Sequence, residues 1–82
     1  MTTATDVITV KLFAGLEART RERRAAYALA PADAATVGEI VALLGLEPGA
    51  TGIVLVNGLH AQAGQAVGAG DEVSLFPPLG GG

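Results

Sequence analysis

The 82-residue sequence contains no cysteine and a single histidine, His60. The lack of cysteine excludes disulfide bonds, thiolate catalysis and metal sites with sulfur ligands. The eight acidic residues do not cluster at the spacing of metal ligands, so we expect no metal site made by this chain alone. We predict that His60 is an ordinary surface residue of a strand.

Aromatic residues and long apolar runs are also scarce. Aromatics make up 4% of the chain and the net charge is −3, which argues against nucleic-acid binding, since such proteins combine basic surfaces with aromatic platforms. The longest aliphatic run, residues 53–56, is far too short to cross a bilayer. The first ten residues lack the basic and apolar regions of a signal peptide. We therefore expect a soluble, cytoplasmic protein.

Four of the five basic residues lie within residues 17–24, in the stretch EARTRERR. Two glutamates in this stretch dilute its positive charge. The simplest interpretation is a solvated turn or a short helix. A docking patch for an acidic partner is the alternative.

The length and composition predict one small domain with a modest core. A chain of this size buries roughly 60% of the surface that it exposes when unfolded. The expected core residues are ten leucines, eight valines and three isoleucines, together with Phe13, Phe76 and Tyr27. This amount of apolar side chain suffices for one sheet with one helix packed against it.

Several segments have the pattern of strands. Residues 7–14 alternate apolar and polar side chains, and residues 25–30 do so more weakly, which predicts a hairpin with a long loop. Residues 53–56 and 59–61 flank Asn57-Gly58, a pair that favours a tight type I′ hairpin turn. A last strand is predicted after a turn at Gly70-Asp71; it directs Val73 and Leu75 to one side and Ser74 and Phe76 to the other.

A short helix is predicted between the two hairpins. Thr36 and Glu39 have the spacing of a capping box, in which each side chain bonds the backbone N–H of the other. Gly45 is typical of the residue just beyond a helix end. One apolar stripe follows the helical spacing and consists of Val37, Ile40, Val41 and Leu44.

The predicted order is strand, strand, helix, strand, short strand, strand. This order lacks the repeated strand–helix units of a doubly wound fold. We therefore predict an α+β domain in which one main helix packs across a mixed sheet of about four to five strands.

The chain closes with SLFPPLGGG. Pro77 and Pro78 end the last strand, because neither can donate a ladder hydrogen bond. We predict a domain over residues 1–76 and an extended flexible tail over residues 77–82, whose glycines allow another protein to approach closely. A frayed terminus is the alternative. Phe76, at the root of the tail, is either an exposed docking residue or covered by a loop.

Four segments resemble the MoaD/ThiS family of sulfur-carrier proteins: VKLFA, TVGEIVALL, VNG and GDEVSLFPPLGGG. The resemblance spans about residues 7–82 and implies the ubiquitin-like β-grasp fold. Within the family, the paired prolines, the KLFA segment and the long loop before the second strand favour the small, sulfur-carrying subunit of molybdopterin synthase. Leu79-Gly80 departs from the pattern, since a small aliphatic residue followed by Ala or Ser is usual there.

The resemblance implies a mechanism in which the chain carries sulfur and its partners supply the catalytic groups. An adenylyltransferase similar to the ubiquitin-activating enzymes would adenylate Gly82 with ATP and Mg²⁺, and a sulfur donor would then convert it to a thiocarboxylate. The tail would next enter the large subunit of molybdopterin synthase, with no cofactor bound to the carrier itself. The resemblance also implies supporting roles: Gly81 would allow the tail to pass through a channel in the partner, and Phe76 would anchor the docked face. The reach and direction of the tail would be set by Gly80, Leu79, Pro78 and Pro77.

Three other functions remain open at this point. The chain could carry sulfur for another pathway, such as that of thiamin, cysteine or a sulfur-containing natural product. It could be a ubiquitin-like modifier joined through Gly82 to lysines of other proteins, although its single lysine, Lys11, suits it poorly to building chains on itself. It could also be a plain β-grasp interaction module.

Overall fold

The computed structural model describes residues 6–47 and 49–78. Its elements, in chain order, are β1 (Ile8–Leu12), η1 (Leu16–Arg19), β2 (Ala26–Leu29), η2 (Pro31–Asp33), α1 (Val37–Leu43), β3 (Ile53–Val56), β4 (Leu59–His60) and β5 (Glu72–Phe76), where η marks a 3₁₀ helix. The predicted order of strands and main helix is confirmed. Within the described residues, no helix is long and apolar enough to cross a membrane.

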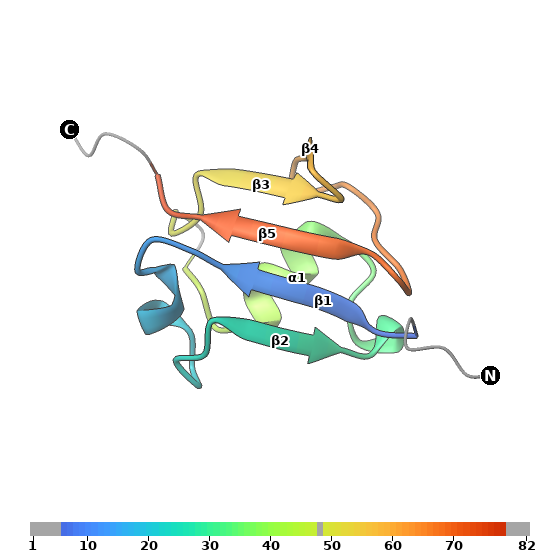
Figure 1. The fold of residues 1–82 in the computed structure, drawn as a ribbon, viewed down its shortest axis with the longest axis horizontal. Coiled ribbons are helices and arrows are strands. Elements are labelled where there is room, and N and C mark those ends of the chain that lie inside the picture. Colours follow the sequence, from blue (N-terminus) through green and yellow to red (C-terminus); the bar gives the residue numbers. More distant parts are fainter. Residues whose placement is uncertain (1–5, 48, 79–82) are drawn as a thin grey trace.

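The strands form one mixed five-stranded sheet in the order β2-β1-β5-β3-β4. β1 and β5 are parallel neighbours, whereas the other adjacent pairs are antiparallel. Figure 1 shows β5 in the middle of the sheet and α1 across one face. This arrangement confirms the predicted ubiquitin-like β-grasp fold.

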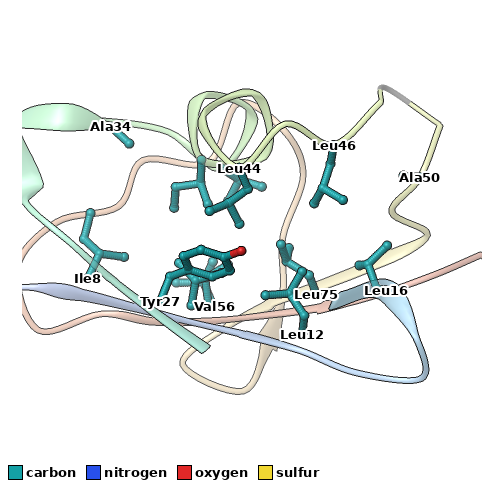
Figure 2. Close-up of a cluster of buried hydrophobic side chains, with 14 residues drawn as sticks. Ile8, Leu12, Leu16, Tyr27, Ala34, Leu44, Leu46, Ala50, Val56 and Leu75 are labelled. Carbon is teal, nitrogen blue, oxygen red and sulfur yellow. The ribbon is translucent and has the colours of Figure 1, made fainter. Parts of the chain in front are cut away.

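The core lies between α1 and the sheet face that it covers. Alternate strand residues point to this face, because successive side chains in a strand point to opposite sides; Ile8, Val73 and Leu75 are among those fully buried. Figure 2 shows side chains of the sheet and the helix pointing toward one another. The predicted inward faces of the first and last strands are therefore confirmed.

The start of α1 differs from the predicted capping box by one residue. The Glu39 N–H donates to Thr36 Oγ1 at 3.2 Å, as expected, but the Glu39 carboxylate accepts from the Ala35 N–H at 2.6 Å rather than from Thr36. The residues ahead of the helix are extended, so this earlier N–H lies within reach of the carboxylate. Gly45 follows the helix with φ at +82°, as predicted for a residue beyond a helix end.

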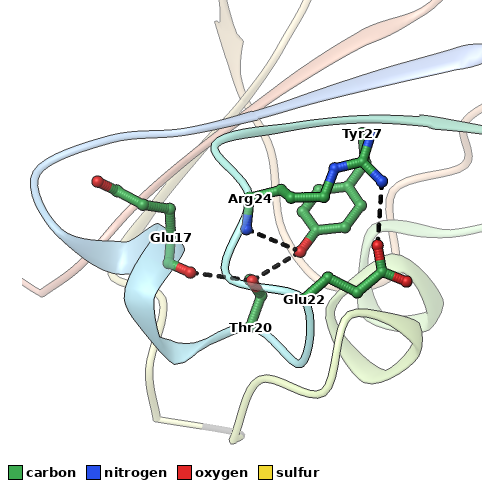
Figure 3. Close-up of polar contacts among 5 residues, drawn as sticks. All are labelled: Glu17, Thr20, Glu22, Arg24 and Tyr27. Carbon is green, nitrogen blue, oxygen red and sulfur yellow. Dashed lines mark hydrogen bonds and ion pairs between the residues drawn. The ribbon is translucent and has the colours of Figure 1, made fainter.

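The arginine-rich connection between β1 and β2 contains a short 3₁₀ helix and folds over Tyr27, as Figure 3 shows. The Tyr27 hydroxyl donates to Thr20 Oγ1 at 2.6 Å, and the Thr20 hydroxyl donates to the Glu17 carbonyl at 2.9 Å. Arg24 lies over the Tyr27 ring, 5.3 Å from its centre, and pairs with Glu22 at 3.0 Å. The prediction of a turn or short helix is thus confirmed, and a docking role for the arginines stays a prediction.

Candidate functional site

β5 ends where the predicted tail begins. The strand stops at Phe76, as expected from the two prolines that follow. One more hydrogen bond ties this end to the sheet, because the Gly52 N–H donates to the Phe76 carbonyl at 2.8 Å. We call Pro77 and Pro78 the tail root; their backbone packs directly against Gly52.

The structure describes three of the seven residues predicted to form the site. Phe76, Pro77 and Pro78 lie together at the end of β5. Four of the predicted site residues lie outside the described part: Leu79, Gly80, Gly81 and Gly82. Sulfur attachment at Gly82, channel passage at Gly81 and the flexible tail over residues 77–82 therefore stay predictions.

An aromatic pair stands beside the tail root. The rings of Phe13 and Phe76 stack with centres 4.8 Å apart and planes 12° from parallel. Phe76 is half-buried and is covered by the ring of Phe13, the first residue of the loop after β1, in agreement with the predicted alternative of cover by a loop. Phe13 itself is 39% exposed, so the prediction that it belongs to the core is wrong. It follows Leu12 of β1, and the alternation of the strand continues through it, which places its ring on the opposite face.

The sheet face opposite α1, called the outer face, changes from apolar to charged along β5. At the end near the tail root, Ile53 pairs with Phe76 and extends the apolar surface, and Leu55 pairs with Ser74 further along. At the other end, Lys11 and Glu72 form an ion pair at 2.9 Å, with both side chains 47% exposed. We call Phe13, Phe76 and Ile53 the aromatic end. An apolar patch next to an extended segment is a surface that a partner can cover.

Hydrogen bonds of the Asn57 side chain to Asp71 and Glu72 hold the opposite end of β5. The Asn57 side-chain amide donates to Asp71 Oδ1 at 3.0 Å, and the Glu72 N–H donates to Asn57 Oδ1 at 2.9 Å. Both Asn57 and Gly58 have positive φ, which confirms the predicted type of hairpin turn. The VNG and GDEV motifs, which are distant in sequence, are therefore one structural unit that anchors the start of β5.

The pKa of Asp71 is lowered from its ordinary value of 3.8, first by the hydrogen bond from the Asn57 side chain and then by that from the Gly68 N–H. Because the fold favours the charged carboxylate, the resulting stability is present above the ordinary pKa and is lost as the pH falls through the lowered value.

We therefore expect the Asp71→Asn variant to be less stable than the wild type near neutral pH, with the difference shrinking below pH ~4. Urea unfolding of both chains at several pH values measures this difference. A gap between the two chains that stays constant down to pH ~2 would contradict a role for the charged carboxylate.

A groove of about 480 Å³ lies between α1 and β3. Its lining includes Val41, Val54 and Ala63, and it contains no titratable side chain. Within residues 6–47 and 49–78, no three His, Cys, Asp or Glu side chains gather closely enough to hold a metal ion.

Two residues of the site were missed in the sequence. Phe13 was assigned to the core, although the strand alternation that buries Leu12 already places the next residue on the outer face. Gly52 carries no signal of its own in the sequence, because its contact with the tail root depends on how β3 and β5 come together.

The chain is similar to known proteins in sequence and in fold. A sequence model of the ThiS family matches residues 10–82. The crystal structure of SAMP1 from Haloferax volcanii shows 33% sequence identity and a TM-score of 0.68. The match covers 93% of this chain and 99% of SAMP1. A crystal structure of H. volcanii small archaeal modifier protein 1 shows 30% sequence identity and a TM-score of 0.64. The match covers 89% of this chain and 98% of that protein.

A further similarity concerns the fold alone. The solution structure of Urm1 from Trypanosoma brucei is 23% identical and covers 99% of this chain and 100% of its own, with a TM-score of 0.71. No curated protein matches the chain in a sequence search.

Proposed function

Given that the chain belongs to the ThiS family, we propose that it is a sulfur carrier whose C-terminal Gly82 is converted to a thiocarboxylate. More narrowly, we propose that it is the small subunit of molybdopterin synthase and donates its sulfur in molybdenum cofactor biosynthesis. The partners are an adenylyltransferase similar to the ubiquitin-activating enzymes, a sulfur donor and the large subunit of the synthase.

The observation that carries the proposal is the aromatic end at the root of the tail. A partner that covers Phe13, Phe76 and Ile53 necessarily lies beside Pro77 and Pro78. Docking there fixes the point from which residues 79–82 extend, and four extended residues reach roughly 13 Å. The partner can therefore hold the carrier on one surface and receive the C-terminus in a site a fixed distance away.

The chemistry requires activation because a carboxylate is a poor electrophile. The C-terminal carboxyl group is ionised at neutral pH, with a reference pKa of about 3.3–3.7. Attack of the carboxylate oxygen on the α-phosphorus of ATP, with Mg²⁺ held by the partner, releases pyrophosphate and forms an acyl adenylate. A sulfur nucleophile from the donor then attacks the acyl carbon and AMP leaves with the bonding electron pair. When the donor delivers sulfide (HS⁻), loss of its proton leaves the thiocarboxylate directly; when it delivers a persulfide, a thiol cleaves the S–S bond of the resulting acyl disulfide and is itself oxidised to a disulfide.

Intact mass spectrometry tests the proposal. After incubation with ATP, Mg²⁺, the cognate activating enzyme and a sulfide source, the chain should gain about 16 Da, the difference between sulfur and oxygen. Capture of a molybdopterin synthase large subunit by the thiocarboxylated chain, followed by sulfur transfer, tests the narrower assignment. An unchanged mass would contradict the carrier function. Transfer to a thiamin-pathway acceptor in its place would contradict the narrower one.

The Phe13→Ala variant should bind the activating enzyme more weakly. Truncation of an aromatic residue near the centre of a docking surface raises the KM for the carrier roughly tenfold, with little change in kcat. Leu43→Ala is the matched control, since Leu43 is similarly exposed, 42% against 39%, but lies on α1 at the other face of the sheet. Pyrophosphate-exchange kinetics measure both values. An equal KM for the two variants would contradict docking through the aromatic end.

A second candidate function is that of a ubiquitin-like modifier. It is favoured by the 30% identity to the H. volcanii protein whose name describes it as a small archaeal modifier. The same activated Gly82 would then be attacked by a lysine amine of a target protein, which forms an amide bond and releases the activating group. Mass spectrometry of cell extract separates the two functions, because conjugation leaves C-terminal residues of this chain amide-linked to target lysines (residues 73–82 after cleavage at Glu72), and sulfur transfer leaves none.

A further inference from the structure

We propose that Gly52 is a positioning residue that sets the direction in which the tail leaves the domain. This inference rests on the proposed function, since direction matters only if Gly82 must reach a site on a partner. Gly52 lies in the loop before β3, so it belongs neither to the tail nor to the aromatic end.

The contact between Gly52 and the tail root is unusually close. A Cβ atom placed on Gly52 would collide most severely with Pro78 Cα, and would lie 2.9 Å from Pro78 N and 3.0 Å from Pro77 O. All three are backbone atoms, so no side chain can rotate away to make room. The tail root occupies the space that a side chain at position 52 would fill.

The need for glycine here is steric and does not come from the backbone conformation. The glycines with positive φ are Gly15, Gly45, Gly58 and Gly70, and Gly52 is not among them. An alanine at position 52 would therefore not have to adopt a positive φ, and the main conflict would be that of its methyl group with the tail root. A substitution at this position is consequently a clean test of the contact.

Neither side of the contact can yield without moving the tail. The Gly52 N–H donates to the Phe76 carbonyl at 2.8 Å, and the next residue, Ile53, pairs with Phe76 in the sheet. Pro77 and Pro78 have no N–H and therefore cannot donate a hydrogen bond to the loop in a new register. A methyl group on residue 52 should therefore push Pro78 away and change the point and the direction in which the chain leaves the domain.

The inference predicts a specific kinetic signature. Gly52→Ala keeps all three side chains of the aromatic end, so the KM for the carrier at the activating enzyme should stay near the wild-type value. The misdirected C-terminus should reach the adenylation site less often, and kcat should fall roughly 10- to 100-fold, as misplacement by about 1 Å does in other enzymes. Loss of folded carrier would act in the opposite way, because it raises the apparent KM and leaves kcat unchanged.

Gly64→Ala is the matched control. A Cβ atom on Gly64 would meet nothing within 4 Å, and Gly64 is likewise absent from the positive-φ glycines. Both variants and the wild type would be assayed by pyrophosphate exchange and by intact mass, with thermal unfolding as the check of folding. Normal kcat in folded Gly52→Ala, together with a normal mass gain in the wild type, would overturn the inference and leave the proposed function standing. No mass gain in the wild type would overturn the proposed function and the inference with it.

A measurement on the wild-type chain covers the case in which Gly52→Ala fails to fold. The close packing predicts a strong nuclear Overhauser effect between an Hα of Gly52 and the Hα of Pro78. Its presence supports the contact without any variant. Its absence would overturn the inference, whether or not the carrier is activated.

Discussion

Removal of Gly82 should abolish thiocarboxylate formation while the domain stays folded. The shortened chain still ends in a glycine carboxylate, but that group lies about 3.3–3.6 Å short of its former position. Because reacting atoms must come within ~3.5 Å of each other in a defined orientation, we expect the rate to fall at least ~100-fold. Intact mass and pyrophosphate exchange measure the loss, and thermal unfolding should be unchanged.

The Gly81→Ala variant tests whether the tail must pass through a narrow channel, because it leaves the length of the tail unchanged. It keeps the terminal carboxylate at full reach but adds a methyl group next to it, so it should impair activation or transfer through steric conflict with the channel that receives the tail. Wild-type rates in this variant would count against a narrow channel. A full mass gain in the shortened chain would contradict the role of Gly82 itself.

The Leu75→Ala variant should destabilise the domain most strongly among single truncations in the last strand. Leu75 is fully buried and lies on the central strand, between Leu12 of β1 and Val54 of β3. Its truncation removes apolar contacts and leaves a cavity, which lowers the free energy of unfolding by about 2–5 kcal/mol. In a domain of this size, the Tm should fall by roughly 10 °C or more.

The Leu59→Ala variant provides the control for this prediction. It removes the same atoms from a leucine that is 73% exposed on β4. We expect a change within about 0.5 kcal/mol, as for most surface substitutions. Urea or thermal unfolding of both variants measures the difference. Equal destabilisation by the two would contradict the assignment of the core.

Most of the fold could be predicted because its signals are local. Alternation placed Val73 and Leu75 inward, the Asn57-Gly58 pair marked the tight hairpin, and Thr36 marked the start of the helix. Each of these features depends on residues within a few positions of one another. The order of the elements then predicted one helix across a mixed sheet, and the resemblance to the MoaD/ThiS family supplied the β-grasp arrangement of the strands.

The features that could not be predicted depend on residues distant in the chain. The stacking of Phe13 on Phe76 requires β1 and β5 to lie side by side, and the packing of Pro78 on Gly52 requires the end of β5 to meet the start of β3. Neither pair has a sequence pattern, since each residue alone fits an ordinary strand or loop. The aromatic end and the tail root therefore became visible only in three dimensions.

The position of β5 has a consequence for the synthesis of the protein. Among the described residues, β5 is the strand that is synthesised last and the central strand of the sheet, with β1 on one side and β3 on the other. The β1–β2 and β3–β4 hairpins can form earlier, but they bond to each other only through β5, and pairing over such sequence distances is slow. A nascent chain that stalls before residue 72 therefore has two separate hairpins and an uncovered core, which exposes it to proteolysis.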